Sequence, residues 1–546
     1  MGWELPPVKE AAPVRRLSAL AIAIGLLTGA IGPSPSAAAA GTPLWVKHVQ
    51  NFPGGISVGP RARLAALSAG VTRAGVTTQQ LVGGTDVQMN GDCDPPLPQD
   101  ETSVAVNTTD PDNAVAAAND FCGDGFWIGH TTDGGATWSS QFKDPKLSPD
   151  SLSIDERRCF GSDPSVVYSD RDAAFYLATL CFSPSNPSSE TQVWRSTDGG
   201  ATWTESVDAA VAITNIAADG TIDGSVFYDK ELLAIDNDPA SSNYGRLYMT
   251  FIKFHMTGAS GRSDFCPVQL ATTDPVGDPD TWTWTHTAVV PDDPGSKGVG
   301  ASANQWAMPV VDETGALDVA YALEDCNTGF DRAFFFKRST DAGASFSAPV
   351  RIDKPGQFAD NPNTQDRLPN KKARAPISPS LVSDPTRDRL LFVYQNNIDR
   401  TVSKADISVQ TSDDFGATWS DTGTVSVTDS GGAAGGDQFF PWIVVDPTTG
   451  DAFAVWFDNR NDPANELIET FLGISTDGGD SWTNELISDE PWDPDLAFFN
   501  CGCFIGDYNG IALGGSLLYP VWTDGRNSAG KPLGQTDIFT DVLSLT

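Results

Sequence analysis

Carboxylate, arginine and tyrosine side chains gather in short segments that precede apolar runs, such as ERRCFGSDP, FYDKELLAI, KKARAPISPS and FIGDYNG. Paired carboxyl groups can act as general acid and general base, and cationic side chains can hold an acidic group of a substrate. The residues that we expect to be catalytic are Asp120, Asp229, Glu231, Asp507 and Tyr508. Those expected to bind substrate are Arg157, Arg158, Lys230 and Arg374, and two further polar candidates are Asp100 and Glu101. The alternative for each is a structural role, such as capping a loop.

Histidine and cysteine offer less chemistry. The four histidines are scattered singly, which disfavours a histidine metal centre or a Ser-His-Asp triad, so we expect no metal ligands among them. The eight cysteines predict disulfides, because the chain carries an export signal (below). Cys159 and Cys181 flank one hairpin almost symmetrically and are expected to pair, and Cys93 with Cys122 is a similar candidate.

These residues are expected to be positioned by β-hairpins, which the sequence shows as pairs of apolar runs separated by a turn. Each pair has two β-rich runs split by an Asp, Pro, Gly or Asn turn, which is typical of a β-hairpin. Seven occur, among them PSVVYSDRDAAFYLATLCF and PWIVVDPTTGDAFAVWFDN. In two of the later units the second run ends in FDNRND or WTDGRN, and this recurrence favours structural salt bridges for Asp458 with Arg460 and for Asp524 with Arg526.

An acidic octet recurs between the hairpins. It reads TTDGGATW at 131–138 and STDGGATW at 196–203, with variants farther on and a stretched form, TTDPVGDPDTW, at 272–282. Its aspartates are Asp133, Asp198, Asp274, Asp341, Asp414 and Asp477. Aspartate can accept hydrogen bonds from its own turn, and glycine allows a positive φ. Six copies therefore predict a structural turn rather than six catalytic acids.

One hairpin and one octet-bearing hairpin together make a four-stranded unit. Repeated four-stranded units are typical of β-propeller blades around a central channel. We predict an all-β propeller of seven blades, with six as the alternative because the last unit lacks an octet. A strand at 85–89, TDVQM, is expected to complete the last blade and close the ring.

The N-terminal region has the features of an export signal. Arg15 and Arg16 precede an uncharged run at 17–32 and a small-residue stretch that offers a cleavage site at 38–40. We therefore predict a signal peptide at 1–40, a linker with a short helix at 41–84, and a propeller at 85–546. The mature protein is expected outside the cell or in the periplasm, without a membrane span and as a monomer. The net charge of −37 disfavours nucleic acid and anionic membranes as partners.

The octet pattern is that of the Asp-box, or BNR repeat, and the chain resembles the sialidase (neuraminidase) superfamily over about 102–546. The resemblance implies a propeller with peripheral boxes and a site at the channel mouth. It also implies arginines on a substrate carboxylate, a tyrosine nucleophile with a glutamate base, and an aspartate acid. Tyr508 with Glu231 and Arg374 match parts of that set, whereas the family's R-I-P motif is replaced by Glu101-Thr102-Ser103.

This resemblance implies a secreted, glycan-active enzyme, a glycoside hydrolase that acts on an acidic sugar at the propeller mouth. Two alternatives stay open, namely a non-catalytic secreted propeller that binds glycan or protein, and a polysaccharide lyase. The expected partner is a carbohydrate. No cofactor is expected to be required, and the acidic loops leave Ca²⁺ binding open.

Overall fold

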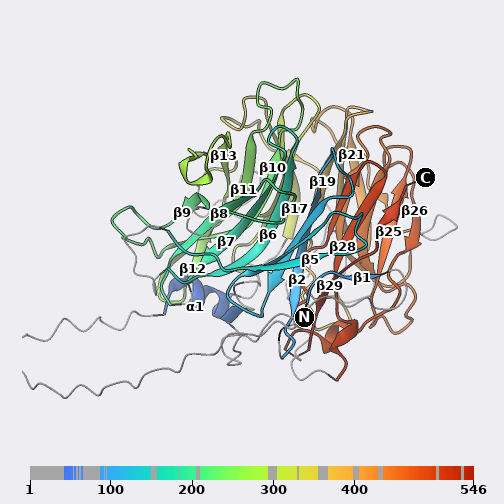
Figure 1. Cartoon of the computed structure of the whole chain (residues 1–546), viewed down its shortest axis with the longest axis horizontal. Coiled ribbons are helices and arrows are strands. Elements are labelled where there is room, and N and C mark those ends of the chain that lie inside the picture. The colour runs from blue at the N-terminus through green and yellow to red at the C-terminus, as the bar shows by residue number, and fades with distance from the viewer. Residues whose placement is uncertain are drawn as a thin grey trace, which may run out of the picture. The chain divides into compact units, whose positions relative to one another are not determined.

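Seven antiparallel β-sheets contain almost all of the regular structure in this computed structural model (Figure 1). The residues that the structure describes are 42–52, 55–56, 60, 63–64, 86–91, 93, 95–148, 157–183, 185–204, 209–292, 304–328, 331–353, 367–396, 405–427, 434–499, 503–530 and 534–545. The predicted signal peptide at 1–40 lies outside these residues. No helix among them is long and apolar enough to cross a membrane.

Six of the sheets are built from four strands each in chain order, with an extra short strand in the third. Blades 1 to 3 comprise β2 Gln99–Val106, β3 Ala114–Asp120, β4 Phe126–Thr131, β5 Ser139–Lys143; β6 Phe160–Ser169, β7 Ala174–Phe182, β8 Ser189–Ser196, β9 Ala210–Thr214; and β10 Val226–Ile235, β11 Leu247–Thr257, β12 Arg262–Phe265, β13 Val268–Thr273, β14 Thr285–Ala288. Blades 4 to 6 comprise β15 Asn304–Val311, β16 Leu317–Glu324, β17 Asp331–Ser339, β18 Val350–Arg351; β19 Ser380–Asp384, β20 Arg389–Asn396, β21 Asp406–Ser412, β22 Gly423–Thr424; and β23 Gln438–Val445, β24 Ala452–Asp458, β25 Glu469–Ser475, β26 Thr483–Leu486.

The seventh blade joins the two ends of the described chain. It contains β27 Gly510–Gly514, β28 Leu517–Asp524, β29 Asp537–Thr540 and β30 Leu543–Ser544, and its outermost strand is β1 Val87–Gln88. β1 pairs antiparallel with β29, with Val87 opposite Thr540. The predicted closure by residues near 85–89 is confirmed, and so is the count of seven blades.

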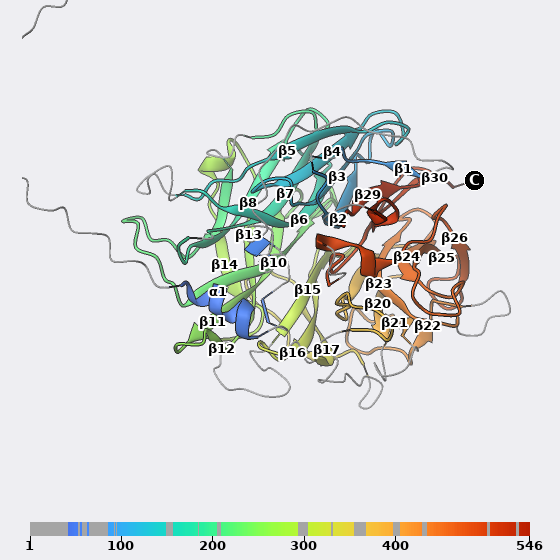
Figure 2. The same ribbon diagram turned by 90° about the horizontal axis from the view of Figure 1, so that it is seen from below.

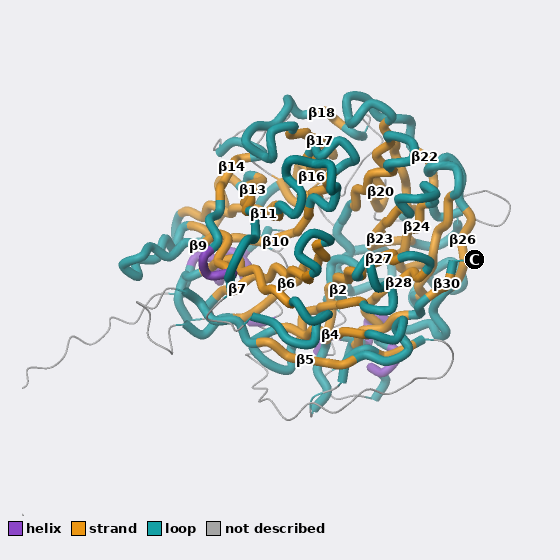
Figure 3. Tube along the Cα trace, turned by 45° about the horizontal axis from the view of Figure 1, so that its top comes forward, coloured by secondary structure: helices purple, strands orange, loops and turns teal. Residues whose placement is uncertain are grey.

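The first strands of the blades contact one another around the channel, and Figures 2 and 3 show the sheets arranged around it. Residues on both faces of the inner strands are buried because each sheet packs between two others. β7, for example, is buried at every position from Ala174 to Phe182. These strands are therefore nearly continuous apolar runs, as expected for sheets covered on both faces.

Five of the octets fold into one hydrogen-bonded turn between the third and fourth strands. In blade 2, Asp198 Oδ1 accepts hydrogen bonds from Ser196 Oγ at 2.9 Å and from the Thr202 backbone N–H at 2.8 Å, while Oδ2 accepts from Thr202 Oγ1 at 2.6 Å. Asp133, Asp341, Asp414 and Asp477 make the same three contacts. The sixth, Asp274, instead pairs with Arg171 at 2.7 Å.

Three disulfides connect described residues. Cys159 pairs with Cys181, and Cys93 pairs with Cys122, which confirms both predicted bonds. A third bond joins Cys266 to Cys326 in blades 3 and 4. The first two tie the start of an inner strand or its preceding segment to the end of the second strand, close to the channel entrance.

The N-terminal segment packs against the blades at the same end. Its helix α1 (Leu44–Asn51) buries Trp45 completely, with the indole 5.3 Å from the Phe182 ring and 5.5 Å from the Phe227 ring. Much of the predicted linker at 41–84 lies outside the described residues, but Arg63 within it is described and fully buried. Its guanidinium donates to backbone carbonyls at Asp120 (2.6 Å) and Gly161 (2.7 Å), so it joins blades 1 and 2.

Candidate functional site

β-Bulges interrupt the inner strands near the entrance of the channel. In five blades the pairing of the first two strands shifts register, and one residue at the bulge has a positive φ although it is not glycine. These residues are Glu101 (58°), Asp163 (55°), Lys230 (55°), Trp306 (56°) and Phe440 (59°). A bulge re-aims a side chain, and strained φ values of this kind concentrate at functional sites.

Lys230 is the hub on which side chains from four blades converge. Its Nζ lies 3.0 Å from Asp507 Oδ2, 3.4 Å from Glu101 Oε1 and 3.5 Å from Asp163 Oδ2. The ammonium also lies 4.8 Å from the centre of the Trp306 ring. The Lys230 side chain is only 3% exposed. We call Glu101, Asp163, Lys230, Trp306 and Asp507 the channel cluster.

Hydrogen bonds and an ion pair from neighbouring side chains hold the carboxyl groups of the channel cluster in place. Asn119 Nδ2 donates to Glu101 Oε2 at 2.6 Å and to Asp100 Oδ1 at 3.0 Å, and its Oδ1 accepts the Asp163 backbone N–H at 2.8 Å. Arg374 Nε forms an ion pair with Asp507 Oδ1 at 3.3 Å. The cluster is therefore held by residues from both sides of the ring.

Burial and neighbouring charges shift the pKa values of the titratable groups in and around the channel cluster. It raises the pKa of Asp100 to about 8 and holds the pKa of Glu101 well above its usual range. Burial alone lowers the pKa of Lys230, but the carboxylates of Asp163, Asp507 and Glu101 more than offset this and raise it well above the ordinary value. The lysine is thus a permanent cation among several carboxyl groups.

Glu231 follows Lys230 and differs from the other carboxyl groups. Its side chain is fully buried, and neither carboxyl oxygen has a hydrogen-bond partner among the described residues. Burial and the neighbouring Asp163 raise the pKa of Glu231 well above its usual range. A buried polar group without a partner is rare in proteins and points to a functional role.

Tyr508 lies where the channel cluster meets a cavity. Its ring centre is 5.1 Å from Lys230 Nζ and 5.9 Å from the Trp442 ring. Burial raises the pKa of Tyr508 well above 10, so its hydroxyl is neutral. Beyond it, a cavity of about 230 Å³ continues along the inner strands and is lined mainly by apolar residues such as Leu233, Met308 and Leu381.

The remaining sequence candidates lie in other surroundings. Asp120 Oδ1 accepts from the Cys122 backbone N–H and from Gln99 Nε2. Arg157 Nε donates to the Leu147 carbonyl, and Arg158 forms an ion pair with Asp124. Asp229 is fully buried in β10. The catalytic and binding roles assigned to these residues stay predictions.

The sequence interpretation missed Asp163, Trp306 and Asn119. Asp163 and Trp306 occupy the same place in their hairpins as Lys230, two residues before the regular pairing of the inner strand resumes. Aligning the hairpins on their turns would have placed these residues in one ring. The Asp–Arg motifs, in contrast, form the predicted salt bridges, with Arg460 2.6 Å from Asp458 and Arg526 2.7 Å from Asp524.

No family model and no curated protein matches the sequence. Solved structures do resemble the fold. A Hadza microbial sialidase is 14% identical, with 77% of this chain and 76% of that chain covered and a TM-score of 0.42. Trypanosoma rangeli sialidase in complex with the inhibitor DANA is 14% identical over 73% of this chain and 57% of that chain, at 0.42. Penicillium chrysogenum alpha-L-arabinanase with arabinobiose is 15% identical over 74% and 98%, at 0.39. Residue roles therefore rest on this chain's own geometry.

Among the described residues, no group of three or more histidine, cysteine, aspartate or glutamate side chains is arranged to hold a metal ion. The channel cluster supplies carboxyl groups, a lysine and an indole, and the adjacent Arg374 and Tyr508 add a guanidinium and a phenol.

Proposed function

We propose that the protein is a secreted glycan-active enzyme, a sialidase-like glycoside hydrolase that acts on an acidic sugar at the propeller mouth. The observation that carries the proposal is the difference between Glu231 and its neighbours. Glu231 is buried, unpartnered among the described residues and held neutral, whereas Asp507 lies 3.0 Å from a lysine ammonium. Two carboxyl groups in such different environments are the pattern of acid–base pairs in enzymes.

In this proposal Glu231 is the general acid, because its raised pKa keeps a proton available for the leaving oxygen at neutral pH. Asp507 acts as the base or nucleophile, and its Oδ2 lies 3.0 Å from the Lys230 ammonium. Arg374, beside Asp507, would hold the carboxylate of the sugar.

Tyr508 then has a supporting role. A tyrosine nucleophile requires a base to take its proton, and the nearby Glu231 is itself protonated. The geometry thus favours a pair of carboxyl groups over the tyrosine and glutamate pair that the family resemblance implies. Three disulfides support an oxidising, extracellular location.

A non-catalytic propeller that binds glycan is the second candidate, and one observation favours it. Lys230 pairs with three carboxylates, and all four side chains are at most 3% exposed. A buried cluster of this kind can have a purely structural role, which is to join the blades.

Release of sugar from sialosides and uronic-acid glycans tests the two candidates. We expect turnover by the wild type, and a decrease in kcat of about 10²–10⁴-fold in Glu231→Gln, since that is the usual contribution of a general acid. The matched control is Glu190→Gln, because Glu190 is also fully buried and its pKa is raised to about 7, but it is bonded to Ser148 and Gln192 in blade 2. Retention of glycans without turnover on any substrate would favour the binding protein.

A further inference from the structure

The octets cover the boundaries between blades. The octet turn of each blade packs against the preceding blade of the ring. The turn at Gly479 in blade 6 shows how closely. Gly479 has a φ of 92°, and a Cβ there would approach Leu391 Cδ2 in blade 5 to 2.8 Å. Gly135, Gly200, Gly343 and Gly416 likewise face Tyr519, Val115, Leu270 and Phe336 of the preceding blades. The stretched octet reaches blade 2 through the ion pair of Asp274 with Arg171.

The described residues of blade 7 include no octet, so no described octet turn covers the boundary between blades 6 and 7. A groove of about 610 Å³ lies there. Blade 6 lines it with Phe453, Leu472 and Ile474, and blade 7 contributes Leu543 and Leu545. The groove lies at the hairpin turns of the blades, at the opposite end of the inner strands from the channel cluster.

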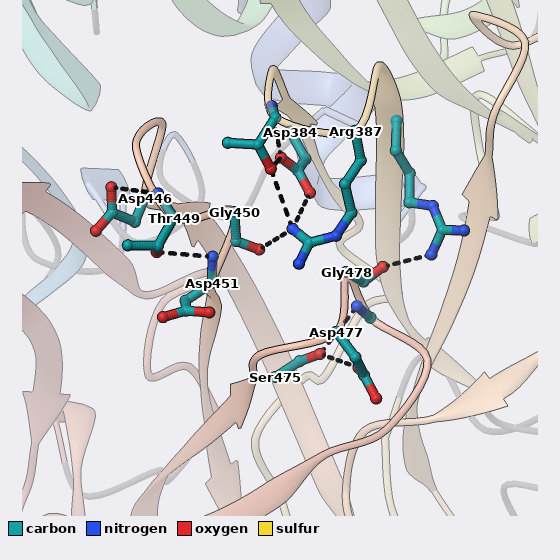
Figure 4. A network of polar contacts seen from close by, with 12 residues as sticks. Asp384, Arg387, Asp446, Thr449, Gly450, Asp451, Ser475, Asp477 and Gly478 are labelled. Carbon is teal, nitrogen blue, oxygen red and sulfur yellow. Dashed lines mark hydrogen bonds and ion pairs between the residues drawn. The ribbon is translucent and has the colours of Figure 1, made fainter.

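The boundary between blades 5 and 6 shows how an octet binds at the equivalent place. Figure 4 shows the Arg387 guanidinium donating to the Gly450 carbonyl at 2.8 Å, beside the octet of blade 6. A second arginine, Arg389, donates to the Gly478 carbonyl at 2.9 Å and pairs with Asp480 of that octet at 3.0 Å. The hairpin of blade 5 therefore contributes arginine side chains to this boundary, and the octet of blade 6 contributes the carbonyl oxygens and the carboxylate that bind them.

The equivalent hairpin of blade 6 has the opposite character. The two turns read DPTRDR at 384–389 and DPTTGD at 446–451, so Thr449 and Asp451 stand in place of the two arginines. Asp446 and Asp384 accept the same type of backbone N–H bond within their turns. The strand register is also equivalent, because Phe453 lies opposite Ile474 as Leu391 lies opposite Thr411, and the blade 6 pair is the more apolar of the two.

Three carboxylates rim the groove, from Asp446, Asp451 and Glu485. None of them has an ion-pair partner among the described residues. An occupant built like an octet would therefore have to present a cation where Asp480 meets Arg389 in the neighbouring boundary.

We propose that this groove docks a turn of a partner protein that resembles an octet but carries lysine or arginine at its sixth position. The five regular octets of this chain have alanine or aspartate there (Ala136, Ala201, Ala344, Ala417 and Asp480), so a second copy does not supply the required cation. The chain's net charge of −37 also disfavours a second copy. The site is independent of the proposed hydrolase activity.

Two disulfide-closed peptides test the proposal, CSTDGGKSWC and CSTDGGDSWC. The second carries the blade 6 octet, and the first differs from it by lysine in place of the residue equivalent to Asp480. Binding is measured by fluorescence anisotropy of labelled peptide. We expect the lysine peptide to bind at least tenfold more tightly, and salt to weaken its binding. Asp451→Arg should reverse the preference, because it restores the charge that blade 5 carries.

The matched control is Glu466→Arg, an equal charge change at an exposed residue of blade 6 outside the groove, which should leave the preference unchanged. Glu485→Lys, also exposed, provides a second variant that weakens binding of the lysine peptide without altering a buried side chain. The proposal is wrong if neither peptide binds saturably, if both bind equally, or if Asp451→Arg leaves the preference unchanged. Concentration-dependent self-association that Asp451→Arg abolishes would identify a second copy as the occupant and overturn it too.

Discussion

At the outer rim, the octets place the same residue types in the same turn, whereas at the channel the bulges place different residue types on the same backbone. Asp198 and four of its counterparts bond to their own turns, and the sixth octet aspartate, Asp274, pairs with Arg171 of blade 2. The bulge positions of blades 1 to 4 hold Glu101, Asp163, Lys230 and Trp306, and the other three side chains contact that of Lys230. A repeated side chain marks a repeated folding role, while divergence on a repeated backbone marks a position free to acquire a function.

The comparison predicts that the channel depends on each residue far more than the rim does. Lys230→Met should produce the largest loss of stability, about 3–5 kcal/mol, because it leaves buried carboxylates without their cation. Denaturant unfolding monitored by tryptophan fluorescence measures this loss. The control is Lys253→Met, which removes a half-buried lysine paired with the exposed Asp292 and should cost less than about 1 kcal/mol. Equal losses in the two variants would contradict the special status of the channel.

The two regions should respond to pH with opposite signs. Burial raises the pKa of Asp100 to about 8 in the folded protein, above the value of about 4 in an unfolded chain. The folded state therefore binds this proton more tightly, and the associated stability is present below about pH 4 and decreases as the pH rises toward 8. Hydrogen bonds from Ser345 lower the pKa of Asp341 at the rim to about 2, so its contribution is present above about pH 4 and is lost as the pH falls toward 2.

Asp100→Asn should accordingly flatten the decrease in stability between pH 4 and pH 8, and Asp341→Asn should flatten the decrease below pH 4. Unfolding free energies measured across this range separate the two effects. We expect the Asp100 effect to be smaller than that of Lys230→Met, because only one carboxyl group changes. A steeper decrease above pH 4 in Asp100→Asn would mean that the folded state favours the charged form of Asp100.

The smallest effect is expected from one octet. Asp198→Ala removes the acceptor that holds the Thr202 N–H and hydroxyl, and we expect a loss of about 1 kcal/mol, as for other local side-chain to backbone hydrogen bonds. Thermal unfolding compared with Thr197→Ala, an exposed polar residue of the same octet, measures it. A loss as large as that of Lys230→Met would mean that the hydrogen bonds of Asp198 also support the packing of the octet on blade 1.

Much of the fold followed from local patterns. The period of the hairpins and octets predicted seven four-stranded blades, and the spacing of the cysteines predicted two disulfides, because these features depend on residues that are close in sequence or repeated. The closing strand near Val87 pairs with the far end of the chain, and it was predicted because the last unit lacked a fourth strand. The candidate site was predicted in part. Glu101, Lys230, Glu231, Asp507 and Tyr508 were recognised as polar residues at the starts of inner strands. Asp163 and Trp306 were missed, because the bulge that turns them toward Lys230 has no residue signature of its own.

The sequence by itself determined the repeated unit, since octet turns and hairpins are built from hydrogen bonds within a few residues. Only the tertiary structure decided which residues meet at the centre. Closure of the ring brings carboxyl oxygens of Glu101, Asp163 and Asp507 to within 3.5 Å of Lys230 Nζ. These four residues lie far apart in the chain, because they belong to blades 1, 2, 3 and 7. The same closure buries them, and burial raises the pKa values of Glu101 and Glu231. It also left a groove between blades 6 and 7, which no octet among the described residues fills.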